Sequence, residues 1–75
     1  MKVIPRGEWD VRGTWKGVRK ESGERSAILT CPDCGLVASL TDHGIAPDGV
    51  VTPSVICPQD GCAFHEWIRL DGWTA

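Results

Sequence analysis

Residues 31–35 read Cys-Pro-Asp-Cys-Gly, and residues 57–62 read Cys-Pro-Gln-Asp-Gly-Cys. These two stretches hold all four cysteines of the 75-residue chain, and 22 residues separate the second cysteine from the third. Two close cysteine pairs at such a distance are typical of a zinc site, because each tight turn can aim two sulfurs at one ion about 2.3 Å away. The spacing therefore predicts one structural Zn²⁺ held by four thiolates, those of Cys31, Cys34, Cys57 and Cys62.

The residues between and beside the cysteines favour tight turns. Pro32 fixes its own φ angle, and Gly35 can supply the positive φ that a metal-binding turn often needs after its second cysteine. The second turn is longer by two residues and has Gly61 just before Cys62. Two alternatives stay open: iron bound by the same four sulfurs, and two disulfides in place of a metal.

The sequence around the cysteines reads as strands and turns. Short apolar or alternating runs predict strands at 26–30, 36–41, 49–56 and 63–70, with turns at 42–44 and 47–49. Pro53 weakens the centre of the third run. In the last run Phe64, Ile68 and Leu70 share one face with Glu66, and His65, Trp67 and Arg69 take the other. We expect Trp67 and Trp73 to be core residues in so small a protein.

The turn Cys31-Pro-Asp-Cys34-Gly, followed by strands and a second cysteine pair that leads into a strand, resembles the zinc-ribbon superfamily over residues 26–70. Residues 61–73 are also similar to small uncharacterised zinc-ribbon proteins of phage and prophage origin. The resemblance implies a small all-β, metal-stabilised fold with three to four short antiparallel strands, used to bind nucleic acid or protein and not for catalysis. The longer second turn and the acidic body depart from the basic ribbons of transcription factors, which puts duplex binding by the ribbon in doubt.

The charge is divided unevenly along the chain. Residues 1–26 carry a net charge of +3 and residues 27–75 a net charge of −5, so all the cysteines lie in the acidic part. We therefore divide the chain into a basic, Trp-containing segment at 1–25 and a zinc-ribbon domain at 26–75. Trp9, Val11 and Trp15 could form strand material that packs on the ribbon, or the two tryptophans could be exposed anchors. The glycine-punctuated stretch from Lys16 to Arg25 reads as a loop or linker.

The remaining polar residues offer few further chemical groups. His65 could replace a cysteine as ligand, and with Glu66 it keeps a catalytic zinc conceivable, but four cysteines already close the tetrahedron. His43, in a turn, is expected to be solvated. A Cys-x2-Cys redox pair is set aside because no helical pattern follows Cys34. A chain this short has no room for a deep pocket, so we expect no enzyme and no small-molecule substrate.

The first residues lack the apolar run of a secretory signal, and no stretch reaches the roughly 18 apolar residues of a membrane span. We therefore expect a cytoplasmic protein (in the host cytoplasm if the gene is viral) with no membrane partner. The favoured function is a protein-interaction adaptor or small regulator. The alternative is nucleic-acid binding through the basic segment, although a pI near 5.5 argues against a strong positive field. The residues proposed to contact a partner are Trp9, Trp15, Lys16, Arg19, Lys20 and Arg25.

Overall fold

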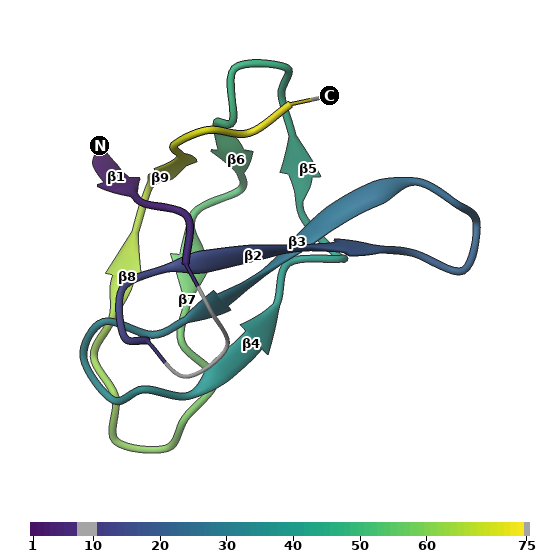
Figure 1. Cartoon of the computed structure of the whole chain (residues 1–75). Coiled ribbons are helices and arrows are strands. Elements are labelled where there is room, and N and C mark those ends of the chain that lie inside the picture. Colours follow the sequence, from purple (N-terminus) through teal and green to yellow (C-terminus); the bar gives the residue numbers. More distant parts are fainter. Residues whose placement is uncertain (8–10, 75) are drawn as a thin grey trace.

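The computed structural model describes residues 1–7 and 11–74, and within these ranges the chain is all β, with nine short strands and no helix (Figure 1). In order, the strands are β1 (Lys2–Ile4), β2 (Trp15–Arg19), β3 (Arg25–Thr30), β4 (Val37–Ser39), β5 (Gly44–Ile45), β6 (Val51–Thr52), β7 (Val55–Ile56), β8 (His65–Glu66) and β9 (Ile68–Leu70). The described residues therefore hold no helix long and apolar enough to cross a membrane.

The largest sheet is antiparallel, with the strand order β2-β3-β4. Its central strand β3 is buried from Ser26 to Thr30, because other parts of the chain cover both of its faces. The prediction of a strand at 26–30 is confirmed. The prediction of a loop from Lys16 to Arg25 is wrong for its first part: β2 pairs with β3, and its Gly17 lies opposite Ala27. The hairpin turn is closed by a backbone hydrogen bond from Lys20 to Glu24, and this hairpin extends to the right in Figure 1.

The N-terminal segment supplies a second strand, β1, which pairs with β9 in parallel. Ile4 lies opposite Leu70, and both side chains are fully buried. The expectation of antiparallel pairing throughout therefore misses this pair, which joins the two ends of the chain. A parallel pair needs a long crossover connection, and here nearly the whole chain lies between the two strands.

The remaining strands form two short antiparallel pairs, β5–β6 and β7–β8. The predicted strand at 49–56 is divided at Pro53 and Ser54, in line with a residue that lacks a backbone N–H. The predicted strand at 63–70 is divided into β8 and β9. Its alternation is confirmed, because Phe64, Ile68 and Leu70 are buried.

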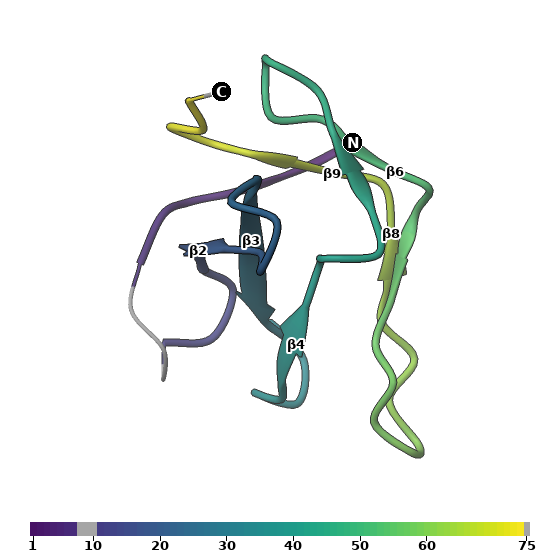
Figure 2. The same ribbon diagram turned by 90° about the vertical axis from the view of Figure 1, so that its right-hand side faces the viewer.

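One hydrophobic core lies between these small sheets, which stand side by side in Figure 2. Its apolar members other than cysteine are Ile4, Trp15, Ala27, Leu29, Leu40, Val51, Val55, Phe64, Ile68 and Leu70. Cys31 and Cys57 complete the core at one end. Trp73 packs against it as expected, with its ring 5.8 Å from that of Trp15. Trp67 is 51% exposed, so its placement in the core is wrong. In the alternation of residues 63–70, Trp67 occupies an outward-facing position.

Candidate metal centre

The first metal-binding turn joins β3 to β4. The backbone N–H of Cys31 donates to the carbonyl oxygen of Leu36 (2.8 Å), and that of Gly35 donates back to the carbonyl oxygen of Cys31 (2.9 Å). Gly35 has φ +79°, so the predicted positive φ after the second cysteine is confirmed. These bonds turn the chain sharply and bring the side chains of Cys31 and Cys34 to the same side.

The second turn joins β7 to β8. The backbone N–H of Cys57 donates to the carbonyl oxygen of Phe64, and that of Cys62 donates to the carbonyl oxygen of Gln59, both at 3.0 Å. Gly61 has φ +82°, which lets the longer turn reverse just before Cys62. The two extra residues are therefore absorbed at the tip of the hairpin, and the second pair of sulfurs still faces the first.

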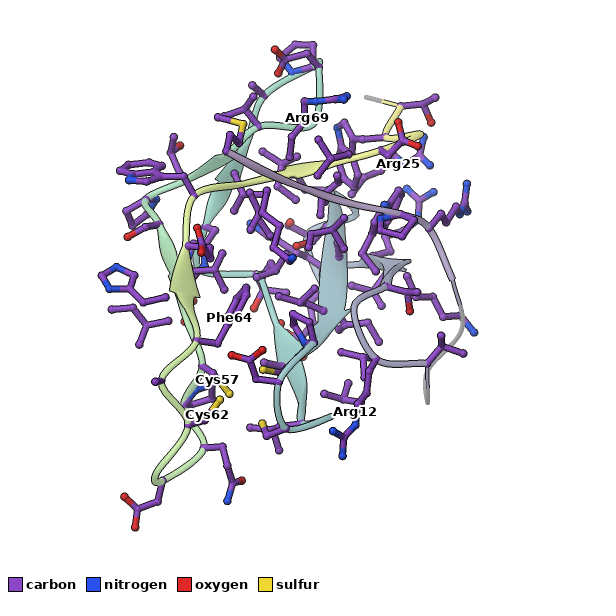
Figure 3. The ribbon with its side chains drawn as sticks, turned by 90° about the vertical axis from the view of Figure 1, so that its left-hand side faces the viewer. Arg12, Arg25, Cys57, Cys62, Phe64 and Arg69 are labelled. Carbon is purple, nitrogen blue, oxygen red and sulfur yellow. The ribbon has the colours of Figure 1, made fainter. Side chains whose placement is uncertain are left out.

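The four sulfur atoms lie within 4.8 Å of one another. The Sγ atoms of Cys31 and Cys62 are 3.7 Å apart, and those of Cys34 and Cys57 are 3.5 Å apart. A regular tetrahedron with metal–sulfur bonds of about 2.3 Å has sulfur–sulfur edges of about 3.8 Å, so these distances suit one four-coordinate ion. A disulfide needs about 2.05 Å, and all four cysteines are free thiols. The disulfide alternative is therefore wrong, and Figure 3 shows Cys57 and Cys62 at the lower end of the molecule.

The surroundings of Cys31 favour its thiolate. Burial raises the pKa of the Cys31 thiol, but hydrogen bonds from the backbone amides of Cys34 and Asp33 and from neighbouring cysteines outweigh this effect and lower the pKa to about 7. Backbone N–H groups aimed at a sulfur stabilise its charged form, which is the form that binds metal. The first turn is therefore preset to present a thiolate near neutral pH.

Before a metal binds, the surroundings of the second turn favour protonated thiols and not thiolates. A backbone hydrogen bond from Gln59 lowers the pKa of Cys57, but burial and the neighbouring cysteines raise it more, to about 12. A backbone hydrogen bond from Phe64 lowers the pKa of Cys62, as does Cys57, but burial and the neighbouring Cys34 and Cys31 outweigh them, so the pKa is raised. Closely spaced thiolates repel one another, so the full set ionises only when a cation lies between them. The cluster thus has the donor chemistry of a metal site.

Residues 11–14 cover the outer side of the first metal-binding turn. Arg12 Nη1 donates to the carbonyl oxygen of Asp33 at 3.1 Å, and a Cβ atom on Gly35 would lie 2.9 Å from Arg12 Nε. The guanidinium group therefore lies against the turn that carries two of the sulfurs, at the end of the molecule where Figure 3 labels Arg12, Cys57 and Cys62. A cation here partly offsets the negative charge that four thiolates leave on a divalent ion.

The histidines do not join the sulfur cluster. His65 is exposed on β8, and its Nε2 atom lies 2.8 Å from Ser54 Oγ. Among the described residues, the group of side chains able to hold a metal contains the four cysteines and no histidine or carboxylate. His43 is half-buried, and its Nδ1 atom is buried with no hydrogen-bond partner in the part of the chain that the structure describes. The expectation that His43 is solvated is therefore wrong.

The structure separates the residues that were predicted to contact a partner. Trp9 lies outside the described residues. Trp15 is 2% exposed, so it packs in the core and does not serve as an exposed anchor. Lys16 is half-buried on β2, and Lys20 forms an ion pair with Glu24 at 3.5 Å. Arg19 and Arg25 are exposed and lie directly opposite each other in the β2–β3 hairpin.

Sequence reasoning missed two features of the surface. Arg6 lies over the ring of Trp15, 5.2 Å from its centroid, and so approaches the β2–β3 hairpin from the N-terminal segment. Ile56 is 63% exposed and pairs with His65, two residues before the exposed Trp67. The alternation already puts Trp67 on the face opposite Phe64, which is a signal of its exposure, whereas nothing in the sequence reveals the position of Arg6 next to β2.

No match was found when the chain was compared with protein-family models, curated proteins and solved structures. The zinc-ribbon and phage-protein resemblances therefore stay predictions.

Proposed function

We propose that the chain is a non-enzymatic structural zinc module that acts as a protein-interaction adaptor. Four cysteine sulfurs at tetrahedral spacing support the zinc assignment, because a shell of four thiolates is closed and leaves no coordination position for a reactive water. In this role Cys31, Cys34, Cys57 and Cys62 would hold the ion, which supplies folding free energy on the order of 10 kcal/mol. Its part in function is to fix the surfaces around it.

Elemental analysis of the purified protein tests the choice of metal. We expect one zinc per chain, loss of NMR chemical-shift dispersion with a strong chelator, and recovery when zinc is added back. Iron bound by the same thiolates would give strong visible absorption, and this result would replace zinc by iron. Unchanged spectra in a metal-free sample would contradict the structural role of any metal.

The adaptor proposal depends on a row of exposed apolar side chains at β1, at β7 and at the break between β8 and β9. Strand pairing defines the row: Ile56 lies opposite His65, and Val3 lies opposite Arg69. Trp67 is two residues from both His65 and Arg69, so it shares their face. We call this row the apolar strip, and its members are Met1, Val3, Ile56 and Trp67, which are between 47% and 71% exposed.

The strip has the composition of a protein contact. Single exposed apolar residues are common, but several on one face with a tryptophan among them are typical of an interface. The side chains of Arg69, opposite Val3, and His65, opposite Ile56, lie beside it on the same face. The partner best suited to this surface is therefore a different protein that presents apolar side chains next to carboxylates. This moves the predicted contact away from the tryptophan-bearing N-terminal segment, since Trp15 is buried.

Photo-crosslinking from position 67 tests the adaptor proposal. A crosslinker placed at Trp67 should give one discrete product, which is then identified and reconstituted with purified partner. In that complex Trp67→Ala should weaken binding about thirty-fold, the effect of a hot-spot residue worth about 2 kcal/mol. Val37→Ala is the matched control, because Val37 is an exposed apolar residue on β4, outside the strip. Crosslinking only to a second copy of the chain, or equal losses for the two variants, would overturn the proposal.

A second candidate, nucleic-acid binding, is favoured by one observation, the opposed pair Arg19 and Arg25. Neither guanidinium forms an ion pair with a carboxylate in the described part of the chain. A mobility-shift assay with single-stranded oligonucleotides tests this candidate, and binding should weaken steeply as salt increases. No shift at low salt would remove it.

A further inference from the structure

Three arginines from different parts of the chain converge on one hollow. The hollow has a volume of about 260 Å³ and is lined by Arg6, Gly17, Val18, Arg19 and Arg25. We call it the arginine hollow. Gly17 has no side chain, so the sheet surface between the arginines stays open. The three guanidinium groups come from the N-terminal segment, β2 and β3.

Each of these guanidinium groups is held in place by a contact that leaves most of its donors free. Arg6 stacks over Trp15, and Arg19 Nη1 donates to the carbonyl oxygen of Gly23 at 2.8 Å. Arg25 lies over the ring of Trp73, 5.8 Å from its centroid, and also donates to Thr74 Oγ1 at 3.2 Å. A guanidinium has five N–H donors, so several in each group remain available to a ligand.

The charge arrangement favours an anion. Like charges directly opposite each other on paired strands are destabilising, and Arg19 and Arg25 hold this position. None of the three arginines forms an ion pair with a carboxylate among residues 1–7 and 11–74. Arginine is the side chain best suited to bind phosphate, because its planar donors match the phosphate oxygens in pairs. The hollow therefore has the chemistry of a phosphate site.

A second hollow adjoins the first, since Arg25 lines both. It has a volume of about 210 Å³, and its other lining residues are Glu24, Ile45, Pro47 and Trp73. We call it the Trp73 hollow. Apolar side chains make up most of its lining, so it suits a flat apolar group attached to the phosphate. A nucleobase is such a group, and aromatic and apolar contacts hold bases without reading their identity.

We propose that the arginine hollow binds the phosphate group of a nucleotide, either free or in a single-stranded nucleic acid, and that the Trp73 hollow takes the attached base. This inference deepens the second candidate function, and it does not depend on the adaptor proposal, because the apolar strip lies on other strands. Arg6, Arg19 and Arg25 bind the phosphate oxygens, while Lys20 is already paired with Glu24.

The test is an NMR titration of the ¹⁵N-labelled, zinc-loaded full chain with inorganic phosphate, adenosine, AMP and a short single-stranded oligonucleotide. We expect AMP to shift the arginine Nε–H and Trp73 indole signals, and to bind at least tenfold more tightly than phosphate or adenosine alone. Arg19→Gln and Arg25→Gln should each weaken AMP binding at least tenfold. Lys2→Gln, which removes an exposed cation on β1 outside both hollows, is the matched control and should leave it unchanged. Zinc content and spectral dispersion show that each variant is folded.

The outcomes separate the sources of the phosphate. Salt-dependent oligonucleotide binding that requires Arg19 and Arg25 supports a nucleic acid as the source. AMP binding without oligonucleotide binding supports a free nucleotide as the ligand. This result would contradict nucleic-acid binding but would support the phosphate site. Equal affinity for phosphate and AMP overturns the role of the Trp73 hollow. No binding of any probe, or equal losses with Lys2→Gln, overturns the site itself.

Discussion

The indole Nε1 of Trp15 donates a hydrogen bond to the carbonyl oxygen of Asp71 at 2.9 Å, across 56 positions of the sequence. The same indole is almost fully buried and packs against Trp73. A residue of the basic N-terminal segment is thus tied to the C-terminal end of the chain. The fold therefore depends on this connection as well as on the cysteines.

A fragment of residues 26–75, loaded with zinc, should lose most of the NMR dispersion of the full chain. The fragment lacks β1 and β2, and with them the buried side chains of Ile4 and Trp15. It also leaves β3 without its partner along one edge. The boundary between residues 25 and 26 stays a prediction until this is measured, and a well-dispersed fragment would establish an independent C-terminal domain.

Trp15→Ala should destabilise the zinc-loaded protein by about 3–5 kcal/mol, the usual cost of removing a buried tryptophan. The substitution also leaves the core beside Trp73 without its partner ring. Trp67→Ala should change the free energy of unfolding by no more than about 0.5 kcal/mol, because Trp67 is half exposed. Urea unfolding of both variants measures the difference. Similar losses would contradict the assignment of Trp15 to the core and Trp67 to the surface.

Gly49→Ala should be much more destabilising than Gly72→Ala. Both glycines have positive φ angles, +93° and +80°, so each substitution costs about 1–2 kcal/mol through the backbone. A Cβ atom at Gly49 would in addition overlap the carbonyl oxygen of Leu70, whereas no other described residue comes within 4 Å of one at Gly72. Thermal unfolding should therefore rank the two variants clearly, and equal midpoints would contradict the close contact between Gly49 and β9.

Metal binding should weaken as the pH falls, and it should release protons at neutral pH. Before metal binds, the pKa of Cys57 is about 12 and that of Cys62 is also raised, so both thiols are protonated at pH 7. Bound zinc requires thiolates, which means that the metal-bound state holds fewer protons and is favoured by higher pH. Calorimetry of zinc binding in buffers with different ionisation enthalpies counts these protons. Proton-independent binding would contradict thiolate ligation by the second turn.

The metal-binding turns could be predicted from the sequence because short-range chemistry decides them. In the first turn, the two cysteines, Pro32 and Gly35 lie within five consecutive residues, and Gly35 has the positive φ expected there. The structure brings the sulfurs of both turns together, as the cysteine spacing predicts. The strand at 63–70 could also be predicted, because the alternation of apolar and polar residues is a local pattern. By contrast, β2 was missed because its glycine and polar residues favour a loop, and only pairing with the buried strand β3 makes it a strand.

The apolar strip and the arginine hollow could not be predicted, because each depends on how distant segments of the chain are placed relative to one another. The parallel pairing of β1 with β9 places Val3 opposite Arg69 and so continues the apolar strip. The position of Arg6 over Trp15 brings its guanidinium to those of Arg19 and Arg25, which are distant in the sequence, and so creates the arginine hollow. No local pattern encodes either arrangement, since both require contacts between distant parts of the chain.

Zinc-edge X-ray absorption of the purified, metal-loaded protein tests the central claim most directly. We expect one zinc per chain surrounded by four sulfur atoms at about 2.3 Å, with no nitrogen or oxygen in the coordination shell. A shell that contains nitrogen or oxygen, or zinc that is present without an ordered shell of sulfur, would contradict the claim that Cys31, Cys34, Cys57 and Cys62 together hold one ion.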